Sequence, residues 1–514
     1  MAEIILSTLN AKYIHAAFGL RYLLANMGAL QSRAALLEFD INQRPLDIAE
    51  ILLAQNPRIV GLGVYIWNVC ETTEVVAALK RVRPELTIIL GGPEVSFETD
   101  QQEIVGLADF VITGEADRKF AEVCGQILRG EQPPTKIIAA ELPDLAALEL
   151  PYHLYSDDDV AHRVIYVEAS RGCPFTCEFC LSSLDVPVRQ VPLEPFLKNL
   201  EQLLARGVQQ FKFVDRTFNL NVNTSRAILE FFLERYRPGL FVHFEMIPDR
   251  LPESLRAVIA RFPRGALQFE VGIQTFDEAV SKNISRRQDY QKLADNFRFL
   301  REATGVHVHA DLIAGLPGES CESFAAGFDR LVALGPQEIQ VGILKRLRGT
   351  PIVRHDAAWQ MIYHTQPPYE ILQNKLIDFA AMQSLRRFAR YWDLVGNSGN
   401  FFRTTPLLWS NGDSPFAGFM RWSEWLFEKV GRQHGIALAH LAELLFRFLT
   451  QERGLDPAEV ARTIWSDWQR AGRSDPPNFL RSWLGDIATG TGTRPREVGP
   501  SVPKRQRRHW AARS

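Results

Sequence analysis

The stretch Ser170-Arg171-Gly172-Cys173-Pro174-Phe175-Thr176-Cys177-Glu178-Phe179-Cys180 sets three cysteines in the spacing C-x3-C-x2-C, directly after a predicted strand. Thiolates are the preferred ligands of iron–sulfur clusters, and a [4Fe–4S] cube needs four ligands, so three cysteines leave one iron open. A closed zinc site needs a fourth protein ligand, and the sequence offers neither a second C-x2-C nor a nearby histidine pair. The stretch therefore predicts a catalytic iron–sulfur cluster, with Cys173, Cys177 and Cys180 as its metal ligands.

The cysteine stretch follows the first of six predicted strands that alternate with segments of helical length. The strands are predicted at 164–168, 210–214, 242–246, 266–271, 306–313 and 338–343. Six such units favour a partial (β/α) barrel over residues 163–351, although a further flat sheet would have the same spacing. Barrel enzymes place active-site groups at the carboxyl ends of their strands. Polar candidates near these positions are Asp215, Glu245, Glu270, Gln274 and Asp311.

Residues 1–140 predict a doubly wound parallel sheet in an α/β fold. Short apolar runs at 4–6, 35–39, 59–65, 87–90 and 110–112 alternate with helical segments. The third and fourth of these runs end in glycine-containing turns. Because such sheets bind their ligands outside the carboxyl ends of the strands, we expect a ligand there.

The rest of the chain divides by composition. The acidic, proline-marked stretch 141–162 is interpreted as a linker, and 352–488 is expected to be mainly helical, with its tryptophans in a hydrophobic core. Residues 489–514 are rich in Gly, Pro, Thr and Arg and include Lys504-Arg505-Gln506-Arg507-Arg508. We expect a disordered basic tail that is solvated, although such a tail can contact nucleic acid.

Bulk composition indicates a globular protein of the cytoplasm. The 514 residues are 46% hydrophobic and carry a net charge of −2, so the bulk charge gives no indication of a nucleic-acid partner. No signal peptide and no apolar run of about 20 residues is present, so we expect no membrane association. Six cysteines cannot form a disulfide framework in a chain of this length, and Cys70, Cys124 and Cys321 are interpreted as small buried hydrophobic residues.

The segment 170–180 is similar to the signature of the radical S-adenosylmethionine (SAM) superfamily, including Phe179 before the third cysteine. This resemblance implies that the open iron binds the amino and carboxylate groups of SAM, and that an electron from the cluster breaks a C–S bond to give a 5′-deoxyadenosyl radical. It also implies a one-electron donor such as flavodoxin or ferredoxin.

Later strands resemble the same family. Residues 269–275 match its E-x-G-x-Q-[ST] strand, and residues 311–319 match its D-x-I-x-G-L-P-G-E turn, in which Gly315 would let the backbone approach the cofactor. SAM offers an ammonium, a sulfonium and a ribose diol, which carboxylates and amides can contact. The resemblance therefore implies that Glu245, Glu270, Gln274 and Asp311 contact SAM. It also implies that Phe179 and Asp215 belong to the cofactor-binding residues.

The sheet that precedes the barrel resembles the cobalamin-binding domain of B12-dependent radical SAM enzymes. The motif D-x-H-x-x-G, which supplies a histidine to cobalt in other families, is absent, and His15 is interpreted as a hydrogen-bonded structural residue. Glycines at the strand ends would admit the corrin and its nucleotide tail. The cobalamin-binding candidates implied by the resemblance are Thr8, Asn10, Tyr65, Gly91, Gly92, Glu94, Gly114 and Glu115.

Two alternatives concern this amino-terminal domain. A methylthiotransferase-like domain with a second cluster needs three further cysteines, whereas this domain has only Cys70 and Cys124, so we reject that alternative. A sheet that has lost its ligand and docks a partner stays open.

Together the resemblances imply a cobalamin-dependent methyltransferase that acts on an unactivated carbon. A cobalamin-independent or non-methylating cyclisation or rearrangement would use the same residues, and a cluster-containing module that binds RNA or protein is the non-enzymatic alternative. The helical region after the barrel resembles the extra domain of one subgroup of B12-binding radical SAM proteins. Nothing in the sequence names the substrate.

Overall fold

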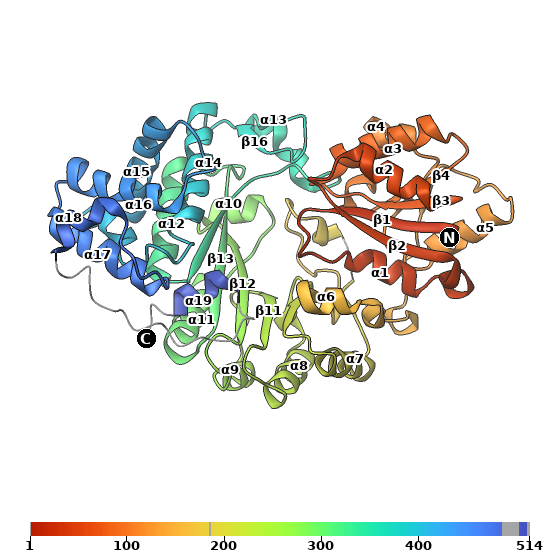
Figure 1. The fold of residues 1–514 in the computed structure, drawn as a ribbon, viewed down its shortest axis with the longest axis horizontal. Helices are drawn as coiled ribbons and strands as arrows, with labels where there is room; N and C mark the ends of the chain where they lie inside the picture. Colours follow the sequence, from red (N-terminus) through yellow and green to blue (C-terminus); the bar gives the residue numbers. More distant parts are fainter. Residues whose placement is uncertain (1, 185–186, 486–502, 511–514) are drawn as a thin grey trace. The chain divides into compact units, whose positions relative to one another are not determined.

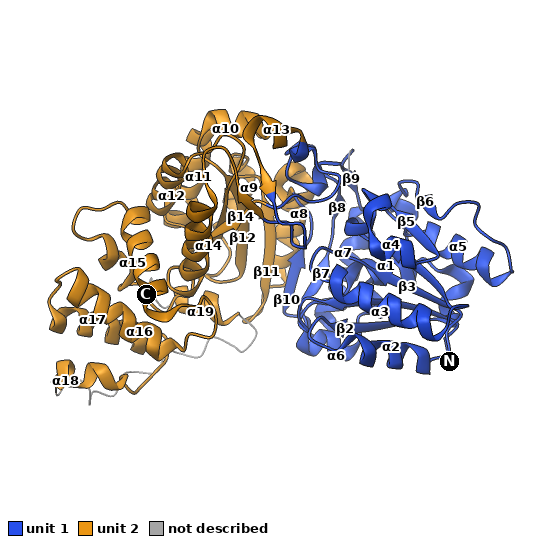
Figure 2. Cartoon of the chain, turned by 90° about the horizontal axis from the view of Figure 1, so that it is seen from above, with its two compact units in different colours: residues 1–216, 345–353, 363–370 blue, residues 217–344, 354–362, 371–514 orange. Residues whose placement is uncertain are grey.

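The computed structural model describes residues 2–184, 187–485 and 503–510 and divides the chain into two compact units (Figure 1, Figure 2). Unit 1 comprises residues 1–216, 345–353 and 363–370, and unit 2 comprises residues 217–344, 354–362 and 371–514. The division therefore falls after Arg216, inside the expected barrel range, and not at the expected linker 141–162.

Unit 1 begins with a six-stranded parallel sheet in the order β2-β1-β3-β4-β5-β6. Its strands are β1 (Ile4–Asn10), β2 (Ala34–Asp40), β3 (Ile59–Gly63), β4 (Thr87–Gly91), β5 (Phe110–Thr113) and β6 (Ile137–Ala139). Its helices are α1 (Phe18–Ala25), α2 (Pro45–Ala54), α3 (Val69–Val82), α4 (Glu103–Leu107) and α5 (Lys119–Leu128). The prediction of a doubly wound parallel sheet is confirmed, and β6 is an additional edge strand.

Both faces of this sheet are covered by hydrophobic residues of the helices. One core contains Val75, Val76 and Leu79 of α3 together with residues of α2 and α4. The other contains Phe120 and Cys124 of α5 together with residues of α1. Figure 1 shows α2, α3 and α4 on one side of the sheet and α1 on the other. Burial on two faces explains why the strands read as continuous apolar runs.

The second half of unit 1 holds the cysteine stretch. It contains α6 (Asp157–His162), β7 (Ile165–Val167), β8 (Ser170–Arg171), β9 (Arg189–Gln190), α7 (Leu193–Ala205) and β10 (Gln210–Phe213). β7 pairs in parallel with β10, and β8 pairs antiparallel with β9 on either side of the cysteine loop. The expected linker is packed into this unit, since Tyr152 and Tyr155 are fully buried and Ser156 caps α6 with a capping box.

Unit 2 begins with four parallel strands in the order β11-β12-β13-β14. They are β11 (Phe241–Met246), β12 (Leu267–Gln274), β13 (His307–Ala314) and β14 (Glu338–Ile343). The helices among them are α8 (Val222–Glu234), α9 (Glu253–Ile259), α10 (Glu278–Asn283), α11 (Tyr290–Ala303) and α12 (Cys321–Leu334). The six strands β7 and β10 to β14 thus alternate with helices, as predicted for a partial barrel.

Side chains alternate along these strands with a period of two. On β13, Val308, Ala310 and Leu312 are buried apolar residues, whereas His309 and Asp311 carry polar groups on the opposite face. The alternation separates a hydrophobic side from a polar side, and the polar side carries the candidate site residues of this unit.

The rest of unit 2 is mainly helical, as predicted. Its helices are α13 (Asp356–Trp359), α14 (Phe379–Leu394), α15 (Pro415–Val430), α16 (Leu438–Arg447), α17 (Pro457–Arg470) and α18 (Arg481–Leu484), and the short strands β15 (Ile362–Tyr363) and β16 (Ile371–Gln373) precede α14. Trp392 and Trp422 are buried and each contacts Phe419, which confirms that aromatic residues form a core here. No described helix is both long and apolar enough to cross a membrane.

The basic segment near the carboxyl terminus differs from the expected disordered tail. Residues 504–510 form helix α19 (Lys504–Trp510), whose Arg505 ion-pairs with buried Glu338 at 2.9 Å. The Gln506 side chain donates to that of Gln268 at 2.6 Å. Tertiary partners at the amino ends of β12 and β14 therefore order a segment whose composition alone predicts disorder. The remaining parts of the expected tail, 489–502 and 511–514, lie outside the described residues.

Candidate functional site

The three cysteines of the motif lie on the loop between β8 and β9 of unit 1. Cys173 and Cys177 are only 9% and 5% exposed, and Cys180 is half-buried. The amide of Cys180 donates to the carbonyl of Cys177 at 3.1 Å, and the Ser183 hydroxyl donates to the carbonyl of Cys180 at 2.6 Å. Gly172, with φ at +90°, turns the chain into the loop. The loop is thus internally braced, and two of its three cysteines are buried.

The donor set of the loop consists of three thiols. Among the described residues, no three His, Cys, Asp or Glu side chains converge as the ligands of one metal ion do. In a [4Fe–4S] cube each cysteine binds a different iron, which is a different geometry from three ligands around one ion. Three thiols on one short, shielded loop fit the donor set of such a cube, and Phe179, half-buried, lies beside the third.

Arg171, two residues before the first cysteine, is surrounded by carboxylates. Its guanidinium donates to Glu168 at 2.8 Å, to Glu115 at 2.8 Å and to Asp117 at 2.9 Å. Arg189 of β9 also ion-pairs with Glu115. We call these five residues the Arg171 cluster. Two of its carboxylates follow β5 of the amino-terminal sheet, so the cluster fastens the cysteine loop to that sheet within unit 1.

The charges of the Arg171 cluster compensate one another. Burial lowers the pKa of Arg171, but the carboxylates of Glu168 and Asp117 outweigh this effect and raise that pKa. Burial raises the pKa of Glu115, and the hydrogen bonds from Arg189 and Arg171 lower it below its ordinary value. Because buried charges are tolerated only when paired and hydrogen-bonded, each member depends on the others.

Asp215, at the carboxyl end of β10, holds the start of the cysteine loop. Its carboxylate accepts hydrogen bonds from the Ala169 amide at 3.0 Å and from the Ser170 hydroxyl at 2.6 Å. Burial raises the pKa of Asp215 to about 7, although these hydrogen bonds act in the opposite direction. Asp215 thus braces the loop backbone, and its role in cofactor binding stays a prediction.

A cavity of about 330 Å³ in unit 1 opens at the carboxyl ends of the amino-terminal strands. One part of its lining is backbone, contributed by Gly61, Gly63, Gly91, Gly92 and Gly114. A second part is apolar, with Leu6, Leu20, Leu23, Ile89, Ile112 and Phe120. The third part is polar and overlaps the Arg171 cluster: Tyr65, Glu115, Asp117, Glu168 and Arg171. The cavity and the root of the cysteine loop are thus adjacent parts of one site.

Two of these glycines are required by the protein itself. A Cβ at Gly61 would lie 2.6 Å from the Phe120 ring, and one at Gly92 would lie 2.5 Å from the carbonyl oxygen of Val64. Gly92 also has φ at +109°, a region that is almost exclusive to glycine. At Gly91, by contrast, a Cβ would meet nothing closer than 3.6 Å, so a longer side chain there would extend into unoccupied space.

Three predicted cobalamin-binding residues do not line this cavity. The Thr8 hydroxyl donates to the carbonyl of Gly63 at 2.7 Å. Glu94 accepts hydrogen bonds from Arg348 at 2.9 Å and from the Tyr369 hydroxyl at 2.6 Å. These side chains are engaged within unit 1, where Glu94 anchors the segment that follows β14.

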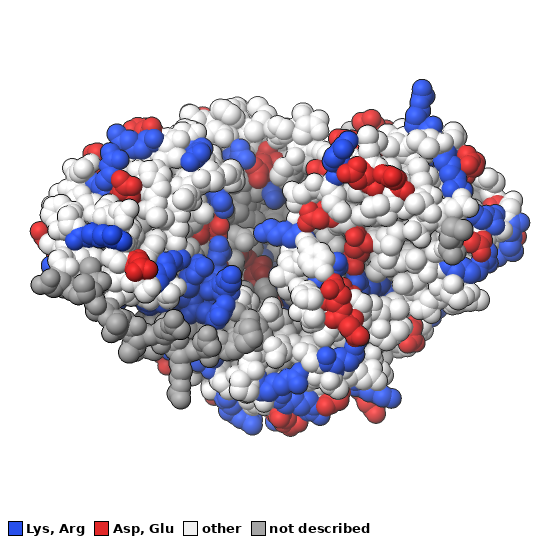
Figure 3. All heavy atoms as spheres, viewed as in Figure 1, with Lys and Arg blue, Asp and Glu red and all other residues white. Residues whose placement is uncertain are grey.

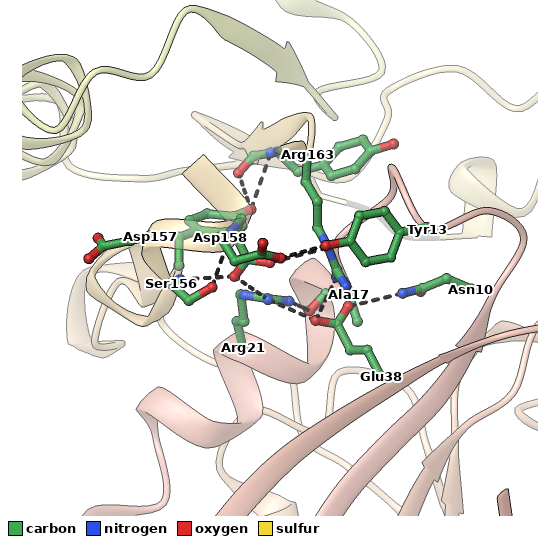
Figure 4. A network of polar contacts seen from close by, with 12 residues as sticks. Asn10, Tyr13, Ala17, Arg21, Glu38, Ser156, Asp157, Asp158 and Arg163 are labelled. Atoms are coloured by element: carbon green, nitrogen blue, oxygen red, sulfur yellow. Dashed lines mark hydrogen bonds and ion pairs between the residues drawn. The ribbon is translucent and has the colours of Figure 1, made fainter. Parts of the chain in front are cut away.

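Asn10 is the third predicted cobalamin-binding residue that does not line the cavity. It belongs to a buried ion-pair network (Figure 4). Its amide donates to Glu38 at 3.0 Å, and Glu38 also binds Arg21 at 2.8 Å and Arg163 at 3.0 Å. Asp159 of α6 completes the network with a contact to Arg21 at 2.8 Å. The network joins β1, α1, β2 and α6, which explains why 141–162 is not a free linker.

Aromatic and imidazole groups surround the same edge of the sheet. His15 contacts the Tyr166 hydroxyl at 2.6 Å, in agreement with its interpretation as a structural residue. Trp67 stacks on Tyr65 with ring centroids 4.5 Å apart, yet it is 47% exposed. Trp67 thus lies beside a residue of the cavity lining.

The polar strand-end residues of unit 2 lie on adjacent strands. Glu245 of β11 and Glu270 of β12 are register partners, and Gly272 of β12 is the register partner of Asp311 of β13. Glu270 lies 3.1 Å from His243. The structure therefore brings these predicted carboxylates together on one side of the sheet.

His309 lies between two of the carboxylates on this side. Its Nε2 is 3.3 Å from Asp311, and its Nδ1 is 3.7 Å from Glu338. Burial lowers the pKa of His309, but these two carboxylates outweigh burial and raise it to about 9. A protonated imidazole thus compensates Asp311 from inside the protein.

Gln274 has two features of a ligand-contacting residue. Its φ is +74° at a β-bulge in β12, and such a conformation in a residue other than glycine stores strain. Its side-chain oxygen is buried without a hydrogen-bond partner among the described residues. A buried acceptor of this kind is costly unless a ligand or water satisfies it, so Gln274 fits a polar group of SAM.

Gly315 lies in close contact with β16 and α14. Its φ is +93°, and a Cβ there would lie 2.7 Å from Ile371 and 3.1 Å from Met382. The glycine is therefore required for packing inside unit 2, and its close approach to a cofactor stays a prediction.

Comparisons with known proteins agree with this geometry. The family model "Radical SAM superfamily" matches residues 167–331, and the model "B12 binding domain" matches residues 5–124. The chain is a B12-binding radical SAM protein. Residues 357–485 match a third model, described as "Protein of unknown function (DUF4080)". The first model begins just before the cysteine loop, and the second contains most of the glycine-lined cavity.

Curated relatives are distant and partial. The "Uncharacterized methyltransferase PH0819" of Pyrococcus horikoshii is 25% identical over 309 residues, which cover 54% of this chain and 65% of the relative. The "Cobalamin-dependent radical SAM methyltransferase TokK" of Streptomyces tokunonensis is 24% identical over 330 residues, which cover 56% of this chain and 47% of the relative. This radical SAM chain thus matches less than two thirds of either relative.

Solved structures show the same fold. The radical SAM methyltransferase TsrM of Kitasatospora setae, with tryptophan and a SAM analogue bound, aligns with a TM-score of 0.57 and 15% identity over 73% of this chain and 80% of that one. The cobalamin-dependent radical SAM enzyme OxsB, with aqua-cobalamin bound, aligns with a TM-score of 0.61 and 13% identity over 99% of this chain and 84% of that one.

Sequence reasoning missed four residues of this radical SAM chain's site. Arg171 lies inside the cysteine stretch 170–180, and Glu168 is the last residue of the strand predicted at 164–168. Asp117 follows two residues after the predicted Glu115, and Trp67 follows two after Tyr65. Their position at or near strand ends was the available signal that they belong to the site. Their mutual contacts join segments far apart in the chain, so the sequence alone does not show them.

Replacing Arg171 with Ala should destabilise the protein strongly. The substitution leaves Glu168, Asp117 and Glu115 buried without their cation, and breaking a buried pair in this way costs about 3–5 kcal/mol. Urea unfolding followed by circular dichroism measures the loss. The control Arg129→Ala removes an exposed pair with Glu131 and should leave the urea midpoint unchanged. Equal midpoints for both variants would contradict the role assigned to the Arg171 cluster.

Replacing Asp215 with Asn should change how stability depends on pH. The folded-state pKa of Asp215 is about 7, above the ordinary value of 3.8, so its favourable contribution is complete below pH 4 and is lost as the pH rises through 7. The parent should therefore lose about 4 kcal/mol of unfolding free energy relative to Asp215→Asn across this interval. Urea unfolding at pH 4, 5.5, 7 and 8 measures the difference, and parallel profiles would refute the shift.

Proposed function

We propose that this chain is a cobalamin-dependent radical SAM methyltransferase that acts on an unactivated carbon. The observation that carries the proposal is the Arg171 cluster, which fastens a shielded three-cysteine loop to a glycine-lined cavity in a B12 binding domain. A radical enzyme without cobalamin would need the loop but not the cavity. The adjacency of the two favours a cobalamin-dependent enzyme over a cobalamin-independent one.

In this proposal Cys173, Cys177 and Cys180 hold the [4Fe–4S] cluster and leave one iron for SAM. Gln274 offers its buried, unsatisfied oxygen to SAM, and Glu245, Glu270 and Asp311 supply carboxylates at neighbouring strand positions. SAM carries an ammonium and a sulfonium, which carboxylates stabilise.

The cavity has the chemistry that a bulky heterocycle requires. Its apolar side suits the aromatic nucleotide tail of cobalamin, and its glycines leave room where side chains would otherwise fill the space. Exposed Trp67, stacked on Tyr65, offers a flat apolar surface at the same edge. When bound, the cluster and SAM supply a hydrogen-abstracting radical, and cobalamin supplies a methyl group.

The protein's own residues hold and shield these groups. The Arg171 cluster fixes the loop that carries the cysteines, and Asp215 holds the backbone where that loop begins. Burial of Cys173 and Cys177 limits access of water and oxygen to the thiols. We place the protein in the cytoplasm, with a one-electron donor such as flavodoxin or ferredoxin. The relatives PH0819 and TokK, which are both named as methyltransferases, support the proposed reaction class.

Replacing Cys177 with Ala should abolish the proposed cluster and with it the cleavage of SAM. One thiolate fewer leaves two irons of the cube without a protein ligand. Iron analysis and chromatography of 5′-deoxyadenosine after anaerobic reduction with SAM measure both effects. The control Cys124→Ala alters a buried cysteine of α5 outside the motif and should retain both. Deoxyadenosine formation by Cys177→Ala would rule the assignment out.

Replacing Gly91 with Leu should lower the affinity for cobalamin at least about tenfold. Gly91 lines the cavity, so the leucine side chain would occupy space that the cofactor needs. Absorption spectra after incubation with hydroxocobalamin and desalting measure the bound fraction. The matched control is Gly106→Leu, at an exposed position of α4 where a Cβ meets nothing within 4 Å. Undiminished binding by Gly91→Leu, with iron content unchanged, would place cobalamin elsewhere.

A further inference from the structure

Unit 2 contains a second group of charged residues that the proposed function does not use. The carboxyl end of α17, the loop 396–400 and helix α19 bring together Arg470, Arg473 and Arg508, which we call the arginine cluster. The backbones approach closely, since a Cβ at Gly399 would lie 2.8 Å from the Cβ of Arg508. The cluster joins the DUF4080-matching region to the carboxyl-terminal helix.

The three guanidiniums donate mainly to neutral acceptors. Arg470 donates to the carbonyls of Arg508 at 2.6 Å and Gly399 at 2.7 Å. Arg473 donates to the side-chain oxygen of Asn400 at 3.1 Å, and Arg508 donates to the carbonyl of Ser398 at 3.0 Å. Carbonyl and amide oxygens satisfy hydrogen-bond geometry but do not neutralise positive charge.

One guanidinium nitrogen of the arginine cluster lacks a hydrogen-bond partner among the described residues. This atom is Nη1 of Arg473, and it is buried. The same guanidinium stacks on the Trp468 ring, with its central carbon 4.7 Å from the ring centroid. The side chain is thus held in position on one face while a donor stays unsatisfied, which is costly without a ligand.

Carboxylates are too few to balance the arginines. Asp467 is fully buried and lies 3.2 Å from Arg470, but it also accepts hydrogen bonds from the amides of Arg403 and Thr404 and from the Thr404 hydroxyl. Among the described residues, the other carboxylates paired to this region are Glu338 and Asp393, and both bind Arg505. Arg473 and Arg508 therefore have no described carboxylate partner.

The electrostatics of the cluster agree with this imbalance. Burial and the charge of Arg508 lower the pKa of Arg473, and burial together with Arg505 and Arg507 lowers the pKa of Arg508. Burial also lowers the pKa of Arg470, with Arg403 acting in the same direction and Asp467 opposing it. Like charges held together in partial burial store repulsion that an anion would relieve.

Figure 3 shows Lys and Arg side chains gathered on the face that carries α17 and α19. We propose that the arginine cluster is a binding site for a phosphate-bearing ligand. The guanidinium fork matches phosphate oxygens in geometry, and several arginines can bind one phosphate with charge-assisted hydrogen bonds. The phosphate source is either a small phosphorylated molecule or the backbone of single-stranded RNA.

The test uses pyrophosphate as the probe and the full-length, anaerobically reconstituted protein. Pyrophosphate should raise the melting temperature of the parent more than sodium chloride at equal ionic strength, because a ligand that binds the folded state stabilises it. Isothermal titration should then show that Arg473→Gln and Arg508→Gln each bind pyrophosphate at least about tenfold more weakly than the parent does. The control Arg298→Gln, at an exposed position of α11, should bind like the parent.

A purely structural role for the cluster predicts a different pattern. If Arg473 serves to bind an anion, Arg473→Gln should be at least as stable as the parent when no anion is present, because the substitution removes a repelled charge. If Arg473 has a purely structural role, its loss should destabilise the fold. Equal responses to pyrophosphate and chloride, or undiminished binding in both variants, would overturn the proposal. Displacement of pyrophosphate by a mixed-sequence single-stranded RNA identifies a polynucleotide as the phosphate source. If the RNA does not displace pyrophosphate, the source is a small phosphorylated ligand.

Discussion

A buried guanidinium must be matched by carboxylates, and at residue 171 the chain supplies three of them from two distant segments. Glu168 comes from the strand just before the cysteine loop, whereas Glu115 and Asp117 come from the turn after β5. Removing any one partner leaves charge in a low-dielectric setting, so the set is stable only as a whole. The loop that carries the cysteines and the sheet that carries the cavity are therefore not independent parts of unit 1.

The cavity depends on a second constraint, which is the absence of side chains. Gly61 and Gly92 cannot bear a Cβ, because Phe120 and the backbone of Val64 already occupy the space. The carboxyl edge of the sheet is consequently built from bare backbone beside apolar side chains. Such an edge in a parallel sheet is where ligands bind, and here the polar side of the cavity is the Arg171 cluster itself.

Local patterns predicted much of this arrangement, and long-range contacts account for the rest. The cysteine spacing, the glycine-ended strands and the polar residues of β11, β12 and β13 are all visible within short windows of sequence. Pairing of Arg171 with Asp117, or of Asn10 with Glu38, joins residues far apart in the chain, and no single window contains both partners. Helix α19 was missed for the same reason, since its order depends on Glu338 and Gln268, while its own composition is that of a disordered segment.

The most direct test of the account is the cofactor content of the intact chain. Full-length protein is reconstituted anaerobically with iron, sulfide and hydroxocobalamin and then desalted, and iron and cobalt are quantified together with the absorption spectrum. The account predicts about four irons and about one cobalamin per chain, bound at the same time. Iron without cobalamin would contradict it, because the glycine-lined cavity beside the cysteine loop would then not be a cobalamin site.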